Sequence, residues 1–506
     1  MKFSNFDEDF RFKKRRTSDT MFIIKVVSII SAIFVIMSSF LFITKIGSSD
    51  SYEYEIEEKG ERYGNSEFIK YQGKISVLVP SGGRYILDDV DINSFRTLSL
   101  EDRNTRIIGL DKKSVYFGNI LIPDLDPNKL EVIGNGYYTD GTNTYFCSPF
   151  SERNKNLSSI MEGLQSLTYS FSKTKKPQSY IYPYKKIETN KKLRAVENLF
   201  SFATDGEKVY YEGEVLENAD LNTLKGVDKY NEYFADKENV YYQSKLLSIK
   251  NSGKLKIVSA KQGYKFLYDE KNGYVFIEDY SFDREKAPYK VIGSGGNHLH
   301  NLVFIAKDGV YYYDSQKKKQ LKAGDNIFIG NIEEITPNIF SDDKNIYYFS
   351  AYDVWKKLRG GGRILFSWNT EIYYLDKKDA WEKVGDVSYG TTGAIWKKGD
   401  RYYYFDDLGI HQLIHNTIYE ISDMATLEYL MNENNVNPDK IRELIENKKL
   451  IAISGEKKME IVVKYESDIL IAARYSKIFL GIFVVIIGIF SMYQKIRKEE
   501  YNENKW

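Results

Sequence analysis

Oxygen-bearing side chains alternate in two short segments of this 506-residue chain, with the spacing that calcium-binding loops use. The segments are DVDINSF and DLDPNKL, and their candidate ligands are Asp89, Asp91, Asn93, Asp124, Asp126 and Asn128. Neither segment has the glycine at the sixth position or the glutamate at the twelfth that complete an EF-hand. Turn formation and helix capping use the same residue types, so a calcium site and a structural role are both open.

Other residues that could do chemistry form incomplete patterns. The four histidines fall into two pairs, His298 with His300 and His411 with His415, but no cysteine or carboxylate pattern completes a zinc site. The GSGG at Gly293 lacks the Lys-Ser/Thr pair of a nucleotide-binding loop, and the sequence contains no nucleophile elbow or zincin motif. Carboxylates are plentiful, yet no feature selects a glycosidase pair. We therefore assign no catalytic residue and expect no cofactor.

Tyrosine is abundant, with 42 copies against 5 tryptophans. An aromatic face with a polar edge suits sugar rings, so the tyrosines could form a platform for glycan stacking. Alternatively, they could form cross-strand ladders inside stacked repeats. The rings recur at one fixed position of a motif instead of gathering in one segment, which favours the structural role.

The elements that position these tyrosines are copies of one turn-and-strand motif. DKKSVYF begins at Asp111, and a clear late copy, DKNIYY, begins at Asp343. Asp and Asn side chains fix tight turns by bonding the backbone two residues on, and the β-branched and aromatic residues that follow suit a pleated strand. Because strand side chains alternate, adjacent tyrosines should face opposite sides. The recurrent positions are Asp111, Tyr116, Asp140, Tyr145, Asp205, Tyr210, Tyr211, Asp236, Tyr241, Tyr242, Asp308, Tyr311, Asp343, Tyr347 and Tyr348.

The spacing of the motifs predicts a repeat protein. Successive aspartates lie 29 (111 to 140), 31 (205 to 236) and 35 (308 to 343) residues apart. Self-similarity on this scale indicates stacked units that cannot bury their apolar faces alone. We expect a mainly β fold of hairpin units, arranged as a β-propeller or an open hairpin array. A unit of about 30 residues is short for a four-stranded blade, so we expect two or three strands per unit.

The DKxxVYY hairpin with its trailing Asp-rich element resembles the DKNYY family of bacterial repeat proteins. The likeness covers about residues 85 to 405 and is clearest near Asp111, Asp205, Asp236 and Asp343. The resemblance implies the repeat architecture. It implies no substrate, cofactor or catalytic residue, because the family carries no established activity.

Two apolar segments bracket the repeats. Residues 21–45 and 470–493 are each long enough to cross a bilayer, and we expect both to be transmembrane helices. Basic residues precede the first span and an acidic segment follows it, so the N-terminus is expected in the cytoplasm. Signal cleavage near Ser48 is the alternative, although no A-x-A-like site is present. With two spans, the C-terminus returns to the cytoplasm and the large domain lies outside a bacterial plasma membrane.

These segments predict the domain organisation. It comprises a tail (1–20), a span (21–45), a spacer (46–84), β repeats (85–407), an α+β unit (408–469), a second span (470–493) and a tail (494–506). An insertion at about 151–192 interrupts the repeats and could contain a short helix at 157–167. In the α+β unit, Ser422 or Asp423 can cap one helix and Asn437 a second, before strands at 450–454 and 459–465.

Composition limits the classes of function. The net charge of +1 gives no electrostatic case for nucleic acid binding, and the single cysteine, Cys147, excludes an intramolecular disulfide. The favoured hypothesis is a membrane-anchored binding or scaffolding module at the bacterial cell envelope, with an envelope protein or a glycan as partner. One alternative is an envelope hydrolase that acts on glycan or peptide through a carboxylate pair. Another is a sensor, whose short tails leave no room for a catalytic output domain.

Overall fold

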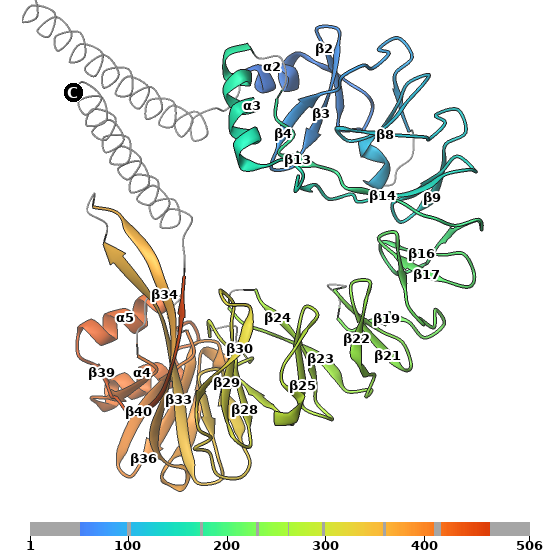
Figure 1. Ribbon diagram of the computed structural model, residues 1–506. Coiled ribbons are helices and arrows are strands. Elements are labelled where there is room, and N and C mark those ends of the chain that lie inside the picture. Colours follow the sequence, from blue (N-terminus) through green and yellow to red (C-terminus); the bar gives the residue numbers. More distant parts are fainter. Residues whose placement is uncertain are drawn as a thin grey trace, which may run out of the picture. The chain divides into compact units, whose positions relative to one another are not determined.

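The chain divides into two compact units, which we describe separately (Figure 1). One unit comprises Met1–Gly226 with Gln243–Leu246, and the other comprises Val227–Tyr242 with Leu247–Trp506. The computed structural model describes residues 51–98, 103–172, 176–228, 232–261, 263–295, 299–357, 361–408 and 416–465. The two expected spans and both tails lie outside these residues. Within the described ranges, no helix is both long enough and apolar enough to cross a bilayer.

Four antiparallel sheets of four strands each build the first unit, and in three of them the strands follow chain order. Their strands are β1 (Glu61–Arg62), β2 (Phe68–Tyr71), β3 (Lys74–Val79) and β4 (Gly83–Ile86); β5 (Arg96–Thr97), β6 (Ile108–Leu110), β7 (Val115–Phe117) and β8 (Ile120–Ile122); β9 (Glu131–Gly134), β10 (Tyr137–Thr139), β11 (Thr144–Cys147) and β14 (Tyr184–Lys186); and β15 (Arg194–Ala195), β16 (Phe202–Thr204), β17 (Val209–Tyr211) and β18 (Glu214–Leu216). The division between the units falls within a fifth sheet. That sheet contains β19 (Lys225–Gly226), β20 (Tyr233–Ala235), β21 (Asn239–Tyr242) and β22 (Lys245–Lys250).

The second unit continues the pattern with two four-stranded sheets and two five-stranded sheets. The four-stranded sheets contain β23 (Leu255–Ser259), β24 (Lys265–Asp269), β25 (Tyr274–Ile277) and β26 (Tyr280–Ser281), then β27 (Lys290–Ile292), β28 (Val303–Ala306), β29 (Gly309–Asp314) and β30 (Lys319–Gly324). The five-stranded sheets contain β31 (Glu333–Thr336), β32 (Ile339–Ser341), β33 (Asn345–Lys357), β34 (Arg363–Lys377) and β40 (Glu456–Lys464), then β35 (Glu382–Val387), β36 (Gly393–Lys398), β37 (Arg401–Asp406), β38 (Ile418–Ile421) and β39 (Leu450–Ala452). Short 3₁₀ turns lie at Arg103–Ile107, Arg284–Lys286, Lys378–Ala380 and Ser388–Gly390.

The prediction of a mainly β repeat fold is confirmed, but the prediction of two or three strands per unit is wrong. Each motif hairpin is the centre of a sheet of at least four strands. The outer strands of several sheets are only two residues long, as in β5, β15 and β19. A two-residue strand shows no alternation of apolar and polar residues, so sequence periodicity could not reveal it.

Adjacent tyrosines of the motif enter different cores, because neighbouring strand residues point to opposite faces of a sheet. In β33, Tyr347 joins a cluster that includes Ile292 of the preceding sheet, while Tyr348 joins a cluster that includes Trp396 of the following sheet. In β10, the strand before the motif at Asp140, Tyr138 and Tyr137 divide in the same way between two cores of the first unit. In these two sheets, adjacent tyrosines therefore join the sheet to both of its neighbours, as nearest-neighbour stacking requires.

The repeat architecture begins earlier than the expected boundary at residue 85. The sheet β1–β4 already has the four-stranded form, and the acidic segment that precedes it is helix α2 (Ser51–Lys59). At the other end, the expected α+β unit at 408–469 is not separate. Its two strands, β39 and β40, complete the last two sheets. The β40 strand pairs Lys464 with Ser367, and the β39 strand pairs Ala452 with Tyr419. Local sequence patterns carry no information on such pairing.

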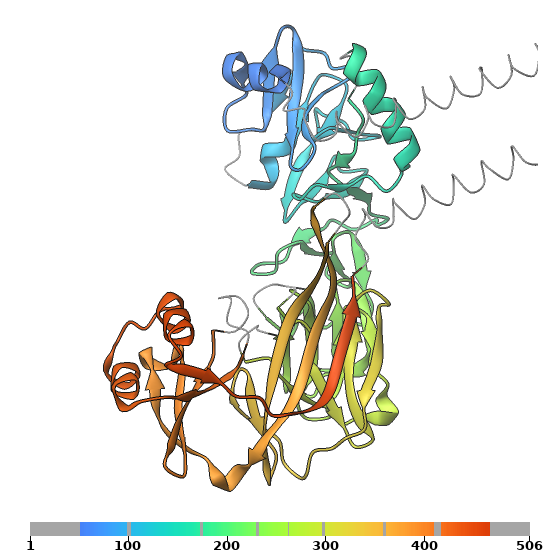
Figure 2. The same ribbon diagram turned by 90° about the vertical axis from the view of Figure 1, so that its left-hand side faces the viewer.

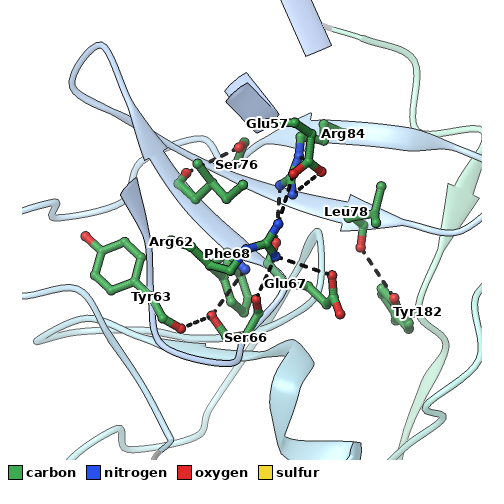
Figure 3. A network of polar contacts seen from close by, with 11 residues as sticks. Glu57, Arg62, Tyr63, Ser66, Glu67, Phe68, Ser76, Leu78, Arg84 and Tyr182 are labelled. Atoms are coloured by element: carbon green, nitrogen blue, oxygen red, sulfur yellow. Dashed lines mark hydrogen bonds and ion pairs between the residues drawn. The ribbon is translucent and has the colours of Figure 1, made fainter. Parts of the chain in front are cut away.

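A buried arginine fixes α2 to the first sheet (Figure 3). Arg84 is 4% exposed, and its guanidinium lies 2.6 Å from Glu57 on α2 and donates to the Glu67 carbonyl at 3.2 Å. The Glu57 carboxylate also forms an ion pair with the Arg62 guanidinium at 2.9 Å. A buried guanidinium is stable only when it is paired, so this network makes the orientation of α2 depend on Glu57.

The expected insertion at 151–192 follows β11 and includes β14, which pairs with β11 at the edge of the third sheet. It contains β12 (Glu152–Arg153), α3 (Ser159–Ser172) and β13 (Tyr180–Ile181), which confirms the helix expected there. Tyr182 returns to the core shared by the first three sheets. Near the C-terminal end, the predicted caps of α4 (Met424–Asn432) and α5 (Pro438–Glu446) are also confirmed. Asp423 accepts from the Thr426 N–H at 2.8 Å, and Asn437 accepts from the Lys440 N–H at 3.0 Å.

Candidate functional site

The motif aspartate is the centre of a small hydrogen-bonded constellation, which we call the Asp–Tyr clamp. Oδ1 of Asp111 accepts from the backbone N–H groups of Lys113 and Ser114, both at 2.7 Å. Oδ2 accepts from the Tyr116 hydroxyl at 3.1 Å. The carboxylate thus closes the hairpin turn and holds the tyrosine of the strand that follows.

The same clamp forms in three further copies in which a tyrosine follows the aspartate by five residues. Tyr210 donates to Asp205 at 2.9 Å, and Tyr241 donates to Asp236 at 3.1 Å. In the late copy the clamp is built on Asp342, which receives the Tyr347 hydroxyl at 3.1 Å.

The assignment of Asp343 to this position is therefore wrong by one residue. Asp343 is exposed and only four residues from Tyr347, so its carboxylate cannot take the place of Asp342 in the turn.

Two copies depart from the clamp. Asp140 caps its turn, but the Tyr145 hydroxyl donates to the Pro123 carbonyl at 3.0 Å instead. Asp308 is exposed and receives Tyr311, three residues on, at 2.7 Å. The second tyrosines of the pairs, Tyr211, Tyr242 and Tyr348, lie on the opposite face of their strands. On that face, the ring centroid of Tyr242 lies 5.0 Å from the ring centroid of Tyr233.

The calcium candidates serve the same turns. The Asp91 N–H donates to Asp111 Oδ2 at 3.0 Å, and the Asp126 N–H donates to Asp140 Oδ2 at 3.0 Å, so each trailing element is fastened to the next motif. Their own carboxylates accept from the N–H groups of Asn93 and Asn128 at 3.2 and 2.9 Å. Asp89 and Asp124 take positive φ angles of 57° and 61°. Among the residues that the structure describes, no cluster of three or more His, Cys, Asp or Glu side chains could hold a metal ion.

The clamp is electrostatically suited to structure and not to proton transfer. Burial alone would raise the pKa of Asp111, Asp205 and Asp342, but hydrogen bonds from backbone N–H groups and tyrosine hydroxyls hold each pKa below its ordinary value. Burial, together with the charge of Asp342, raises the pKa of Tyr347 to about 12. Both partners therefore keep one protonation state across the neutral range, whereas a general acid or base must change its state.

A recess of about 110 Å³ lies in the second unit. Its lining combines aromatic rings with charged groups: Glu232, Tyr233, Tyr242, Gly263, Tyr264, Lys265, Ile277 and Glu278. Lys265 Nζ lies 3.1 Å from Glu232. Burial, followed by the charges of Glu278 and Glu232, raises the pKa of Tyr242 to about 12, so its hydroxyl remains a hydrogen-bond donor at neutral pH.

Most residues of this recess lie outside the recurring motif. Only Tyr242 belongs to the motif, while Glu232, Tyr264 and Glu278 come from segments that flank the strands. Their types and spacings match no known pattern, and only the pairing of β20 with β21 and of β24 with β25 brings them together. No sequence signal could have selected them.

Two further titratable groups of the second unit, His300 and Asp407, lie outside the recess. His300 lies 3.0 Å from Asp353 and stacks on Trp368, while His298, His411 and His415 lie outside the described residues. Burial raises the pKa of Asp407 to about 6, against the opposing effects of Thr336 and Lys383. Neither group lines the recess.

Successive antiparallel sheets of four or five strands, several of them built on a hairpin that an Asp–Tyr clamp closes, define a tandem-repeat β protein. The model of the DKNYY family matches residues 68–245, so this part of the chain is a DKNYY-type repeat region. No curated protein sequence matches the chain.

Among solved structures, the crystal structure of the tricorn protease aligns with 78% of this chain at 11% identity and a TM-score of 0.13. The alignment spans 43% of the tricorn protease chain. A likeness of this size says nothing about activity.

Proposed function

We propose that this protein is a membrane-anchored binding or scaffolding module at the bacterial cell envelope, with its repeat region outside the cytoplasm in a propeller-like or open array. The observation that carries the binding role is the contrast between the repeated residues, which serve the fold, and the recess. The clamp aspartates and tyrosines are committed to turns and to cores between sheets, whereas the recess presents aromatic rings and charged groups to solvent.

The sequence supports the anchorage. Residues 21–43 contain one charged residue, Lys25, and residues 478–492 contain none. Basic residues lie before the first segment and after the second, at Arg15 and Arg16 and at Lys495 and Arg497. Positive residues resist translocation, so both ends belong in the cytoplasm.

The recess suits a polyhydroxylated ligand such as an envelope glycan. Tyr242 and Tyr264 can contribute ring faces, while Glu232, Lys265 and Glu278 can hydrogen-bond hydroxyl groups. A hydrolase would need one carboxyl kept protonated by burial. Glu278 is exposed and Glu232 is paired with Lys265, so the recess favours binding over hydrolysis.

The anchorage is tested with an epitope tag at residue 1 of the full-length protein. We expect the tag to persist on the mature, membrane-bound chain and to be protected from protease in intact cells. Loss of the tag from the mature chain would mean signal cleavage and would contradict the two-span arrangement.

The binding role is tested by titrating N-acetylglucosamine oligosaccharides onto the detergent-solubilised full-length protein. Tyr264→Ala should weaken binding by about tenfold, because stacking of one ring contributes on the order of 1 kcal/mol. Tyr389→Ala is the matched control, because Tyr389 is 81% exposed and does not line the recess. Equal effects of the two variants, or no binding by the wild type, would contradict a glycan site in the recess.

A further inference from the structure

One hairpin of the second unit continues well past its sheet neighbours. β33 and β34 contain 13 and 15 residues, and their pairing runs from Asn345↔Lys377 to Lys357↔Arg363 (Figure 2). The clamp and the tyrosine pair occupy only the first residues of β33. The remainder forms an arm, and we call residues 354–357 and 361–366 the arm end.

The arm end concentrates positive charge beside an exposed ring. Trp355 is 53% exposed, and Lys356, Lys357 and Arg363 are all exposed. Residues 354–366 contain no acidic residue, in a chain whose net charge is only +1. The nearest acidic residue on the strand, Asp353, is held by His300 at 3.0 Å. Basic residues around an exposed tryptophan are typical of segments that contact the headgroups of anionic lipids.

The course of β40 places the arm end near the second apolar segment. β40 is antiparallel to β34, and its pairing ends at Ser367↔Lys464, after which the Tyr465 N–H donates to the Phe366 carbonyl at 2.8 Å. The chain therefore leaves β40 in the direction of the arm end.

Simple lengths show that both can reach one surface. The five residues from Tyr465 to the apolar segment that begins at residue 470 span at most about 17 Å. The arm end extends three residues beyond Val354, which pairs with Ser367, or about 10 Å. The arm end is therefore within reach of the plane where the apolar segment begins.

Polar contacts brace the arm along its length. Glu371 on β34 is 6% exposed and receives Tyr352 at 3.1 Å, Tyr373 at 2.6 Å and Lys457 of β40 at 3.1 Å. The three strands β33, β34 and β40 thus share one buried, fully paired carboxylate. A braced three-stranded ribbon holds its end in a fixed direction, as a docking element must.

We propose that the arm end docks on the anionic lipid surface of the membrane that the second apolar segment enters. Lys356, Lys357 and Arg363 contact lipid phosphates, and Trp355 lies at the headgroup level. The proposal rests on the membrane anchorage proposed above. Glu466 and Asp468 follow β40 in the sequence, so pairing within the chain is the competing explanation for these charges.

The test uses the full-length protein reconstituted into liposomes of phosphatidylcholine alone or of phosphatidylcholine with phosphatidylglycerol in equal parts. Hydrogen exchange is measured for residues 354–357 and 361–366 at low and high salt. We expect phosphatidylglycerol to slow exchange severalfold, and high salt to reverse the effect. Brominated lipid should quench the wild type more than Trp355→Phe.

The variant K356Q/K357Q/R363Q should abolish the lipid dependence, because each basic residue contributes about a fivefold preference for an anionic surface. The control K317Q/K318Q/K319Q removes the same charge from the turn between β29 and β30 and from the first residue of β30, and should leave the lipid dependence intact.

Four results would overturn the proposal. Equal exchange in both lipids, with the protein still floating with the liposomes, would refute the docking and leave the anchorage standing. Failure of the wild type to float would refute the anchorage and the docking together. Equal protection of the arm end by soluble polyphosphate over neutral lipid would identify a soluble polyanion as the partner. Loss of protection on E466Q/D468N, without any lipid dependence, would identify pairing within the chain.

Discussion

The sheet β5–β8 and the sheet that contains β33 and β34 begin with the same clamp and end differently. In the first, Asp111 holds Tyr116, and β7 stops after three residues at Gly118, whose φ of 54° turns the chain. In the second, Asp342 holds Tyr347, and no such turn follows, so β33 continues for ten more residues. In both sheets the clamp lies where the strand starts, while the position of the next turn sets how far the strand reaches.

Burial follows the same division. All three residues of β7 are buried, whereas exposure along β33 rises from 3% at Tyr347 to 53% at Trp355. The clamped part of each strand should stabilise the fold, and the unclamped part should contribute a surface. The four predictions below test this division.

The largest effect is expected from removing a clamped tyrosine. Tyr347→Ala should lower the free energy of unfolding by about 3–5 kcal/mol, the usual cost of truncating a buried aromatic residue. Tyr347→Phe keeps the ring and loses only the hydroxyl bond to a charged acceptor, so it should cost about 1–3 kcal/mol. Denaturant titration measures both. Equal costs for Ala and Phe would mean that the hydroxyl, and not the packing between sheets, carries the stability.

The damage from Tyr347→Ala should also be local, because each sheet contacts mainly its neighbours. Hydrogen exchange should speed up in the β31–β34 sheet and leave β5–β8 unchanged. Uniform exchange throughout the chain would show one cooperative unit instead of a stack.

Removing the clamp carboxylate should have the next largest effect. Asp342→Ala leaves the N–H groups of Lys344 and Asn345 and the Tyr347 hydroxyl without their acceptor, and should cost about 2–4 kcal/mol. Asp343→Ala is the matched control on the neighbouring exposed residue, and should change stability by less than about 0.5 kcal/mol. Thermal melting of the two variants distinguishes the two positions. A larger loss of stability from Asp343→Ala than from Asp342→Ala would mean that Asp343 is the clamp residue.

Removing the charge of Asp407 should stabilise the fold, whereas removing the Asp342 carboxylate should destabilise it. The difference arises because the Asp407 carboxyl is buried without a clamp. Its folded pKa of about 6 exceeds the ordinary value of 3.8, so the group stabilises the fold fully below 3.8 and loses that contribution as pH rises through 6. Asp407→Asn should therefore raise stability at pH 7.5, by about 1–3 kcal/mol. At pH 4 the gain should largely vanish. A gain that does not depend on pH would mean that the charge of Asp407 is not the cause.

Local patterns in the sequence predicted the mainly β repeat fold, the helix in the insertion and the caps at Asp423 and Asn437. The helix and the caps depend on residues close together in the sequence, and the repeat fold depends on one short motif that recurs along the chain. Non-local pairing is what the sequence could not supply. The two-residue outer strands, the addition of β40 to β34 and the meeting of Glu232 with Glu278 all depend on which segments become neighbours after folding.

The smallest effect should come from the arm end, and it separates the arm from the stacked sheets. Trp355→Ala should change the melting temperature very little, because the side chain is 53% exposed and lies past the last core residues of β33. Trp368→Ala, in the same sheet, should cost about 3–5 kcal/mol, because its ring is 8% exposed and belongs to the core. Melting in detergent measures both variants. A large loss from Trp355→Ala would mean that the arm is part of the folding core and that its length serves stability alone.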